Sequence, residues 1–189
     1  MLKPCHIVNF KMNIARLAAH SEMPPPEHAM RQLTAQLSAV GDAVISELFN
    51  IDPVKFEEQL TEARKYNAAY LMHGKNGVTI AIAAPTSLIK PGNIIRKNMI
   101  VPKQYTHKPE DIDKHIMIGV FLFGNVCAGQ LERIDEIKLA GWTDTEMLNQ
   151  WKFTALPDTF KTKLSVVAMP CARLYPIKEL PGKLKEYMQ

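Results

Sequence analysis

The chain has 189 residues, 47% of them hydrophobic and 22% charged, with a formal net charge of +4 at pH 7. This composition is typical of a folded globular protein and excludes a disordered or collagen-like chain. The longest apolar runs fall short of the roughly 18–20 residues of a membrane-spanning helix, so we expect a cytoplasmic protein without membrane contact. The length suits a single domain, residues 1–189.

Within that domain we expect a lead-in at residues 1–25, a helical pair at 26–65 and a sheet-containing core at 66–189. The apolar residues of the lead-in match both periods, so it predicts either a strand or a short helix, leading into a loop. After prolines at 24–26, an apolar stripe at three- and four-residue spacing predicts a helix to about Leu48. Gly41 interrupts this stripe, which indicates close packing.

Asp52 followed by Pro53 predicts the N-cap and first turn of a second helix. From Tyr66 the helical period gives way to strands. Residues 68–72 and 78–84 then predict a hairpin around the turn at 73–77, with Asn-Gly as its signal. A polar passage at 85–110 follows, and it contains a short strand at 99–101.

A second hairpin is predicted from Asp113 to Trp142, with Gly124-Asn125 as its turn. Thr143 is the expected cap of a short helix over 144–151, with Glu146 as its capping-box partner. A strand at 164–169 and a helix at 177–188 end the chain. Helices followed by strands indicate an α+β (α/β-like) fold: a single mixed sheet with flanking helices and a helical N-terminal part.

A turn at Gly124-Asn125 would bring Asp113 close to Glu136 and Lys138 on the returning strand. Two carboxylates can bind Mg²⁺ while a lysine stabilises charge on phosphorus. These three residues are therefore the candidate catalytic set of a nuclease, with Asp113 and Glu136 as metal ligands. The alternative is a solvated mixed-charge strand face, since chance alone gives an acid-x-Lys triplet about once or twice here.

Basic residues gather in the polar passage and at its end. Loops held by a sheet often contact phosphate, so we expect nucleic-acid binding there. A solvated loop whose lysines maintain solubility is the alternative. The candidate nucleic-acid-binding residues are Lys90, Arg96, Lys97, Lys103, Lys108 and Lys114.

The cysteines and histidines give little sign of a metal or a disulfide. Cys5, Cys127 and Cys171 are odd in number, lie far apart and form no Cys-x-x-Cys pair. The six histidines are not spaced as helical metal ligands. We expect no cofactor, except Mg²⁺ if the protein is an active nuclease. The ten methionines, Met72 among them, suggest core packing, or an adaptable partner surface as the alternative.

The strand ending in Ala140-Gly141-Trp142, the short helix after it and the closing segment 172–180 resemble the distal part of phage and bacterial proteins of the PD-(D/E)xK restriction-endonuclease-like superfamily. The resemblance covers roughly residues 40–185. It implies a metal-binding Asp and a Glu-x-Lys in the earlier hairpin. This sequence has Asn67 or Ala68 at the first position and Ala81 and Ala83 at the others. Alanine cannot bind a cation or orient a water molecule.

The resemblance therefore implies a catalytically silent nuclease-like protein from a phage or mobile element. It would bind nucleic acid or a host or phage protein, for example as an anti-defence factor. Two alternatives stay open: an active Mg²⁺-dependent nuclease using Asp113, Glu136 and Lys138, and a structural or assembly protein with no nucleic-acid role. An exposed sheet edge could also pair two chains as a homodimer.

Overall fold

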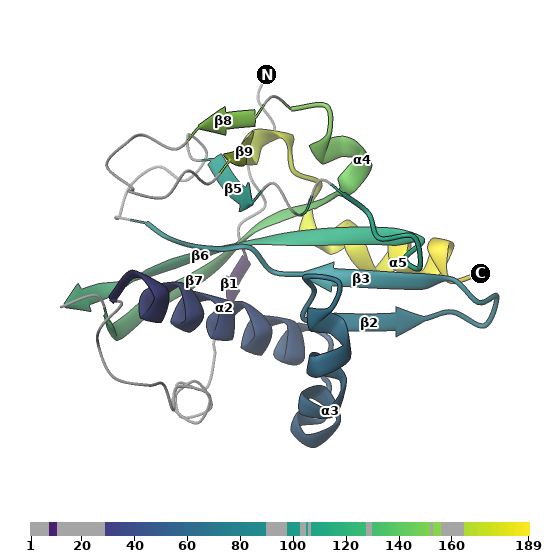
Figure 1. The fold of residues 1–189 in the computed structure, drawn as a ribbon, viewed down its shortest axis with the longest axis horizontal. Coiled ribbons are helices and arrows are strands. Elements are labelled where there is room, and N and C mark those ends of the chain that lie inside the picture. The colour runs from purple at the N-terminus through teal and green to yellow at the C-terminus, as the bar shows by residue number, and fades with distance from the viewer. Residues whose placement is uncertain are drawn as a thin grey trace.

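The structure of the protein is a computed structural model. It describes residues 8–10, 29–89, 98–102, 105, 107–127, 130–151, 153–155 and 165–189. Within these residues the fold is α+β, with a six-stranded mixed sheet at its centre and a three-stranded antiparallel sheet packed beside it (Figure 1). The α+β class and the mixed sheet expected from the sequence are confirmed, and the smaller second sheet is an addition to them.

The main sheet has the strand order β1-β7-β6-β3-β2. β3 and β4 lie one after the other along β6 and run parallel to it, whereas the other pairs are antiparallel. The central strand β6 is buried from Ile116 to Leu122, which explains its continuous apolar run. The strands are β1 (Val8–Phe10), β2 (Tyr70–His73), β3 (Thr79–Ala83), β4 (Thr86–Leu88), β6 (Lys114–Cys127) and β7 (Gln130–Asp144).

One face of the main sheet is covered by α2 (Ala29–Leu48), whose buried stripe includes Val44 and Ile45. Gly41 lies where α2 meets the sheet, because a Cβ there would be 2.5 Å from the carbonyl oxygen of Ala84. The close packing predicted for this glycine is confirmed. It lets the helix backbone approach the end of β3.

The second helix, α3 (Pro53–Arg64), begins as predicted. The side chain of Asp52 accepts hydrogen bonds from the backbone N–H groups of Val54 and Lys55, at 3.1 and 3.3 Å. This cap satisfies two of the N–H groups that a helix start leaves without an intrahelical partner. None of the helices in the described part of the chain is both long and apolar enough to cross a membrane.

The opposite face of the main sheet is covered by the smaller sheet, of order β5-β9-β8, and by α4 (Thr145–Leu148). Its strands are β5 (Asn98–Pro102), β8 (Phe153–Ala155) and β9 (Ser165–Pro170). The two layers share a core cluster of apolar side chains. These are Ala83, Met99, Val101, Met117, Leu148, Val167 and Met169.

The end of the chain returns to the α2 face through two short 3₁₀ turns, η3 (Cys171–Arg173) and η4 (Ile177–Glu179), and the helix α5 (Leu180–Tyr187). Trp142 holds this return in place. Its indole N–H donates to the carbonyl oxygen of Pro176 at 3.1 Å, and its backbone exchanges two hydrogen bonds with Tyr175. α5 is thereby fixed to the same layer as α2.

Most elements predicted from the sequence are present, with shifts at some ends. The cap of α4 is one residue from its predicted position: Asp144, the last residue of β7, takes the place of Thr143 and accepts from the N–H of Met147 at 2.8 Å. β4 and β8 were not predicted. Residues 11–28 of the expected lead-in and helix start lie outside the described residues.

Candidate functional site

The β6–β7 hairpin turns later than its sequence predicts. Gly124 and Asn125 remain within β6, and pairing continues until Cys127 lies opposite Gln130. Register shifts near these two residues mark bulges. A Cβ at position 124 would overlap the carbonyl oxygen of Arg133, so the glycine serves a close strand approach. The predicted turn at Gly124-Asn125 is therefore wrong.

The longer hairpin changes which residues lie opposite each other. A turn at Gly124-Asn125 would place Asp113 opposite Glu136, but the actual register pairs Glu136 with Phe123. Phe123 is ten residues further along the chain than Asp113, which corresponds to about 33 Å along a strand. The predicted convergence of Asp113 with Glu136 and Lys138 is wrong, and these residues form no common Mg²⁺ site within one chain.

Each of the three residues has local partners instead. Asp113 accepts a hydrogen bond from the backbone N–H of Thr79, with 2.7 Å between N and Oδ2. Lys138 forms an ion pair with Glu136, with 2.9 Å between Nζ and Oε2, and its ammonium lies 5.1 Å from the centre of the Phe123 ring. The charges on β7 thus neutralise each other on the strand, as the solvated-face alternative expects.

Ala81 and Ala83, where the nuclease resemblance would place Glu and Lys, are core residues. Their relative exposures are 0% and 2%. Ala83 packs against Met99 and Met117 beneath the smaller sheet. Charged side chains at these two positions would be buried without water, at a large energetic cost. Asn67, the candidate first position, is exposed and adopts a positive φ of 54° after α3.

Four of the candidate nucleic-acid-binding residues lie outside the described residues: Lys90, Arg96, Lys97 and Lys103. Lys108 is exposed and donates to the backbone carbonyl of Asp113 at 3.3 Å. Lys114 forms an ion pair with Glu146, with 2.6 Å between Nζ and Oε1. This hydrogen bond raises the pKa of Lys114 and lowers that of Glu146. Binding of nucleic acid here stays a prediction.

The sequence analysis missed a buried histidine at the start of β6. His115 is 1% exposed, and neither ring nitrogen has a hydrogen-bond partner in the described structure. Burial lowers its pKa to about 4, so the ring is neutral near pH 7. Its ring lies beside that of Tyr105, with 5.6 Å between ring centres, and the Thr145 hydroxyl donates to the His115 backbone carbonyl at 3.4 Å.

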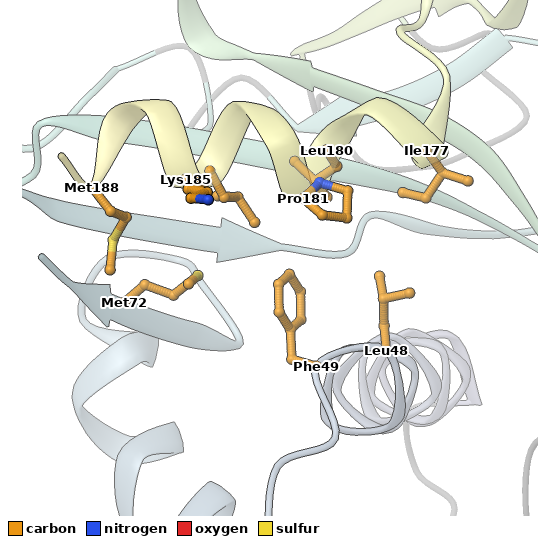
Figure 2. A pocket seen from close by; sticks show the side chains of 9 residues that line it. Leu48, Phe49, Met72, Ile177, Leu180, Pro181, Lys185 and Met188 are labelled. Carbon is orange, nitrogen blue, oxygen red and sulfur yellow. The ribbon is translucent and has the colours of Figure 1, made fainter.

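A different feature offers space for a ligand. An apolar groove of about 480 Å³ lies between α5 and the end of α2 (Figure 2). We call it the α2–α5 groove. It is lined by Leu48, Phe49, Met72, Ile177, Leu180, Pro181, Leu184, Lys185 and Met188.

The walls of the α2–α5 groove come from segments far apart in the chain. Leu48 and Phe49, at the end of α2, point toward the helix α5 on the other side (Figure 2). Met72 of β2 and Met188 after α5 lie near each other at one end of the groove. Phe49 is supported by Tyr70, with 5.9 Å between their ring centres. Both methionines can adjust their shape to an occupant, because their side chains are unbranched.

Lys185 is the one charged residue among the nine that line the groove. It is exposed, and it forms no ion pair with any described residue. Its neighbour Lys183 does form one, with 2.8 Å between Nζ and Oε1 of Glu186. The chemistry of the groove is therefore an apolar surface with one unpaired ammonium group at its edge.

Comparisons with known proteins add no family to this description. No protein-family model matches the chain, and no curated protein matches it either. Within the described residues, no group of three or more His, Cys, Asp or Glu side chains is arranged to hold a metal ion. The groove itself could not be found from the sequence. In the apolar pattern of the chain, Leu48, Met72 and Leu184 cannot be told from ordinary core residues.

Proposed function

We propose that this protein functions by binding a small apolar molecule in the α2–α5 groove. The groove carries the proposal, because its volume of about 480 Å³ falls within the roughly 300–1,000 Å³ of small-molecule sites. Its lining is apolar except for one lysine. Such a lining stabilises an apolar ligand by removing its surface from water.

The size of the groove favours a small molecule over a protein segment. Stable protein interfaces use about 20–30 residues on each side, whereas nine residues line this groove. Part of its lining is also packed into the hydrophobic core, since Ile177, Leu180 and Leu184 are at most 7% exposed. A site held in this way is largely formed before the ligand arrives, which lowers the entropy lost on binding.

The proposal agrees with a nuclease-like relative that has lost its catalytic centre. The burial of Ala81 and Ala83 and the separation of Asp113 from Glu136 support only the lack of a catalytic centre at these positions. A binding function needs none of these positions. It also leaves the nucleic-acid hypothesis as a separate prediction, which we consider in the Discussion.

Titration with octan-1-ol, followed through amide resonances of the ¹⁵N-labelled protein, tests the proposal. We expect saturable shifts concentrated in α5, the end of α2 and β2. Met188→Trp should fill part of the groove and weaken binding at least about fivefold, because it removes volume that the ligand needs. Val54→Trp is the matched control, since Val54 is 66% exposed on α3 and does not line the groove.

Two results would contradict a small-molecule site. The first is non-saturable shifts spread over the surface and equal in both tryptophan variants. The second is a concentration-dependent dimer, measured by light scattering, that Met188→Trp abolishes and Val54→Trp preserves. The second result would assign the groove to another copy of the chain.

A further inference from the structure

The lysines around α5 differ in how their charges are balanced. Lys114 is paired with Glu146 at 2.6 Å, and Lys183 with Glu186 at 2.8 Å. Both ammonium groups also lie over the ring of Tyr187, at 5.4 and 5.0 Å from its centre. Lys185 has no ion-pair partner among the described residues, and it lines the α2–α5 groove.

We propose that the α2–α5 groove selects amphiphiles that carry an alkyl chain and one carboxylate, with the carboxylate paired to Lys185. This inference rests on the proposed function and names the class of ligand that the groove takes. The charge pattern supports it, because the lining contains one cation and no anion. A ligand with one negative group balances that charge, and its chain lies on the apolar side chains.

The geometry of α5 suits this arrangement. All four of Leu180, Pro181, Leu184 and Lys185 line the groove, but the two leucines are buried, whereas Pro181 and Lys185, one position further along, are exposed. A lysine at such a place can lay its alkyl stem along apolar surface while its ammonium stays near water. The carboxylate would thus sit at the groove edge, where it remains partly hydrated, and the chain would extend toward Met72 and Phe49 (Figure 2).

A partly hydrated ion pair gives a measurable but moderate preference. Exposed pairs contribute little, whereas hydrogen bonds to charged groups contribute more. The pair with Lys185 would lie between a fully exposed ion pair and a buried charged hydrogen bond. We therefore expect the carboxylate to bind about three- to tenfold more tightly than the neutral ligand of equal chain length. A cationic ligand of the same length should bind more weakly than the neutral one, because Lys185 repels it.

The experiment compares octanoate, octan-1-ol and octylammonium by isothermal titration and amide resonances at constant ionic strength. The two ionic ligands are kept below their critical micelle concentrations and octan-1-ol below its solubility limit. The expected order of affinity is octanoate, then octan-1-ol, then octylammonium. Lys185→Met should remove the preference for octanoate, so that octanoate no longer binds more tightly than octan-1-ol. Lys178→Met is the matched control: Lys178 is exposed on η4 and outside the groove lining, so the preference should persist.

The outcomes separate this inference from the proposed function. Equal affinities for octanoate and octan-1-ol in the unchanged protein would overturn the carboxylate preference and leave the apolar groove supported. A preference for octanoate that survives Lys185→Met, or that Lys178→Met removes equally, would overturn the role of Lys185. Failure of all three ligands to bind would overturn the proposed function, and the carboxylate preference with it.

Discussion

Asp113 and Thr79 exchange two hydrogen bonds at the point where β6 begins beside β3. The Thr79 backbone N–H donates to the Asp113 carboxylate at 2.7 Å, and the Asp113 backbone N–H donates to the Thr79 carbonyl at 2.9 Å. The parallel register continues from there with Ile80 opposite Lys114. Asp113, which resembled a metal ligand in the sequence, thus forms the first hydrogen bonds between the parallel strands β3 and β6.

Replacing Asp113 with alanine should therefore destabilise the fold. The variant leaves the Thr79 N–H without its carboxylate partner, and we expect a loss of about 1 kcal/mol in unfolding free energy. Urea denaturation followed by circular dichroism measures it. Glu110→Ala is the control, because Glu110 is an exposed acid in the preceding loop. Equal stability of both variants would contradict a structural role for Asp113.

The separation of Asp113 from Glu136 leads to a second prediction, on metal dependence. Because Glu136 lies opposite Phe123, ten residues along the chain from Asp113, Mg²⁺ or Mn²⁺ should not raise the thermal midpoint through a shared site. Glu136→Gln should leave any cleavage of labelled DNA by the purified protein unchanged. Calorimetry with metal or with EDTA measures the thermal midpoint, and a gel-based assay measures DNA cleavage. Metal-dependent cleavage lost in both Asp113→Asn and Glu136→Gln would refute it.

Local signals in the sequence predicted local structure well. The Asp52 cap and the hairpin around Asn76-Gly77 depend on residues near each other in the chain. The Gly41 contact is with the distant Ala84, but its signal was local, a glycine within the apolar stripe of one helix. The position of the second hairpin turn depends on pairing along the whole of β6 and β7. Gly124 and Asn125 lie beside bulges in β6 and do not form the turn. A rule based on these two residues alone therefore predicted the wrong register.

The α2–α5 groove was out of reach for a different reason. Its lining joins the end of α2, one residue of β2 and the last helix, and their contact depends on how the chain returns through Trp142 and Pro176. Apolar periodicity marks such residues as buried but does not tell which of them leave a space between helices. The sequence offered one related signal, the alternative of an adaptable methionine surface that included Met72.

Two glycines near this return should respond in opposite ways to alanine. Gly141 has a φ of +137°, and a Cβ there would lie 2.6 Å from the carbonyl oxygen of Tyr175. Gly141→Ala should therefore cost about 2 kcal/mol or more. Gly182 lies in α5 with no atom within 4 Å of its added Cβ, so Gly182→Ala should stabilise by about 0.5–1 kcal/mol. Urea denaturation compares the two, and equal destabilisation would contradict this account.

The nucleic-acid hypothesis makes its own prediction for Lys108. If the basic passage contacts phosphates, the affinity for labelled DNA should fall steeply with salt, and Lys108→Ala should reduce the slope by about one unit. Lys55→Ala is the control, since Lys55 is exposed on α3. Fluorescence anisotropy over a salt series measures both slopes. An absence of binding at low salt would favour a protein with no nucleic-acid role.

Burial of His115 predicts a loss of stability in acid. Because the folded-state pKa of about 4 lies below the ordinary histidine pKa of 6.5, the unfolded chain takes up this proton first as the pH falls. The contribution is therefore complete above about pH 6.5 and is lost progressively toward about pH 4, by about 3 kcal/mol in all. Tyr105, beside its ring, and Thr145, bonded to its backbone carbonyl, are both uncharged in this pH range and do not oppose the shift.

His115→Leu removes that proton uptake, so its unfolding free energy should decline less between about pH 7 and pH 4 than that of the unchanged protein. The quantity to compare is the slope of the unfolding free energy against pH, because leucine also alters the packing by the same amount at every pH. His107→Leu is the control: His107 is exposed, and the variant should follow the unchanged protein. Urea denaturation at several pH values gives the three curves. A His115→Leu curve parallel to the other two would show that the buried imidazole takes no part in acid unfolding.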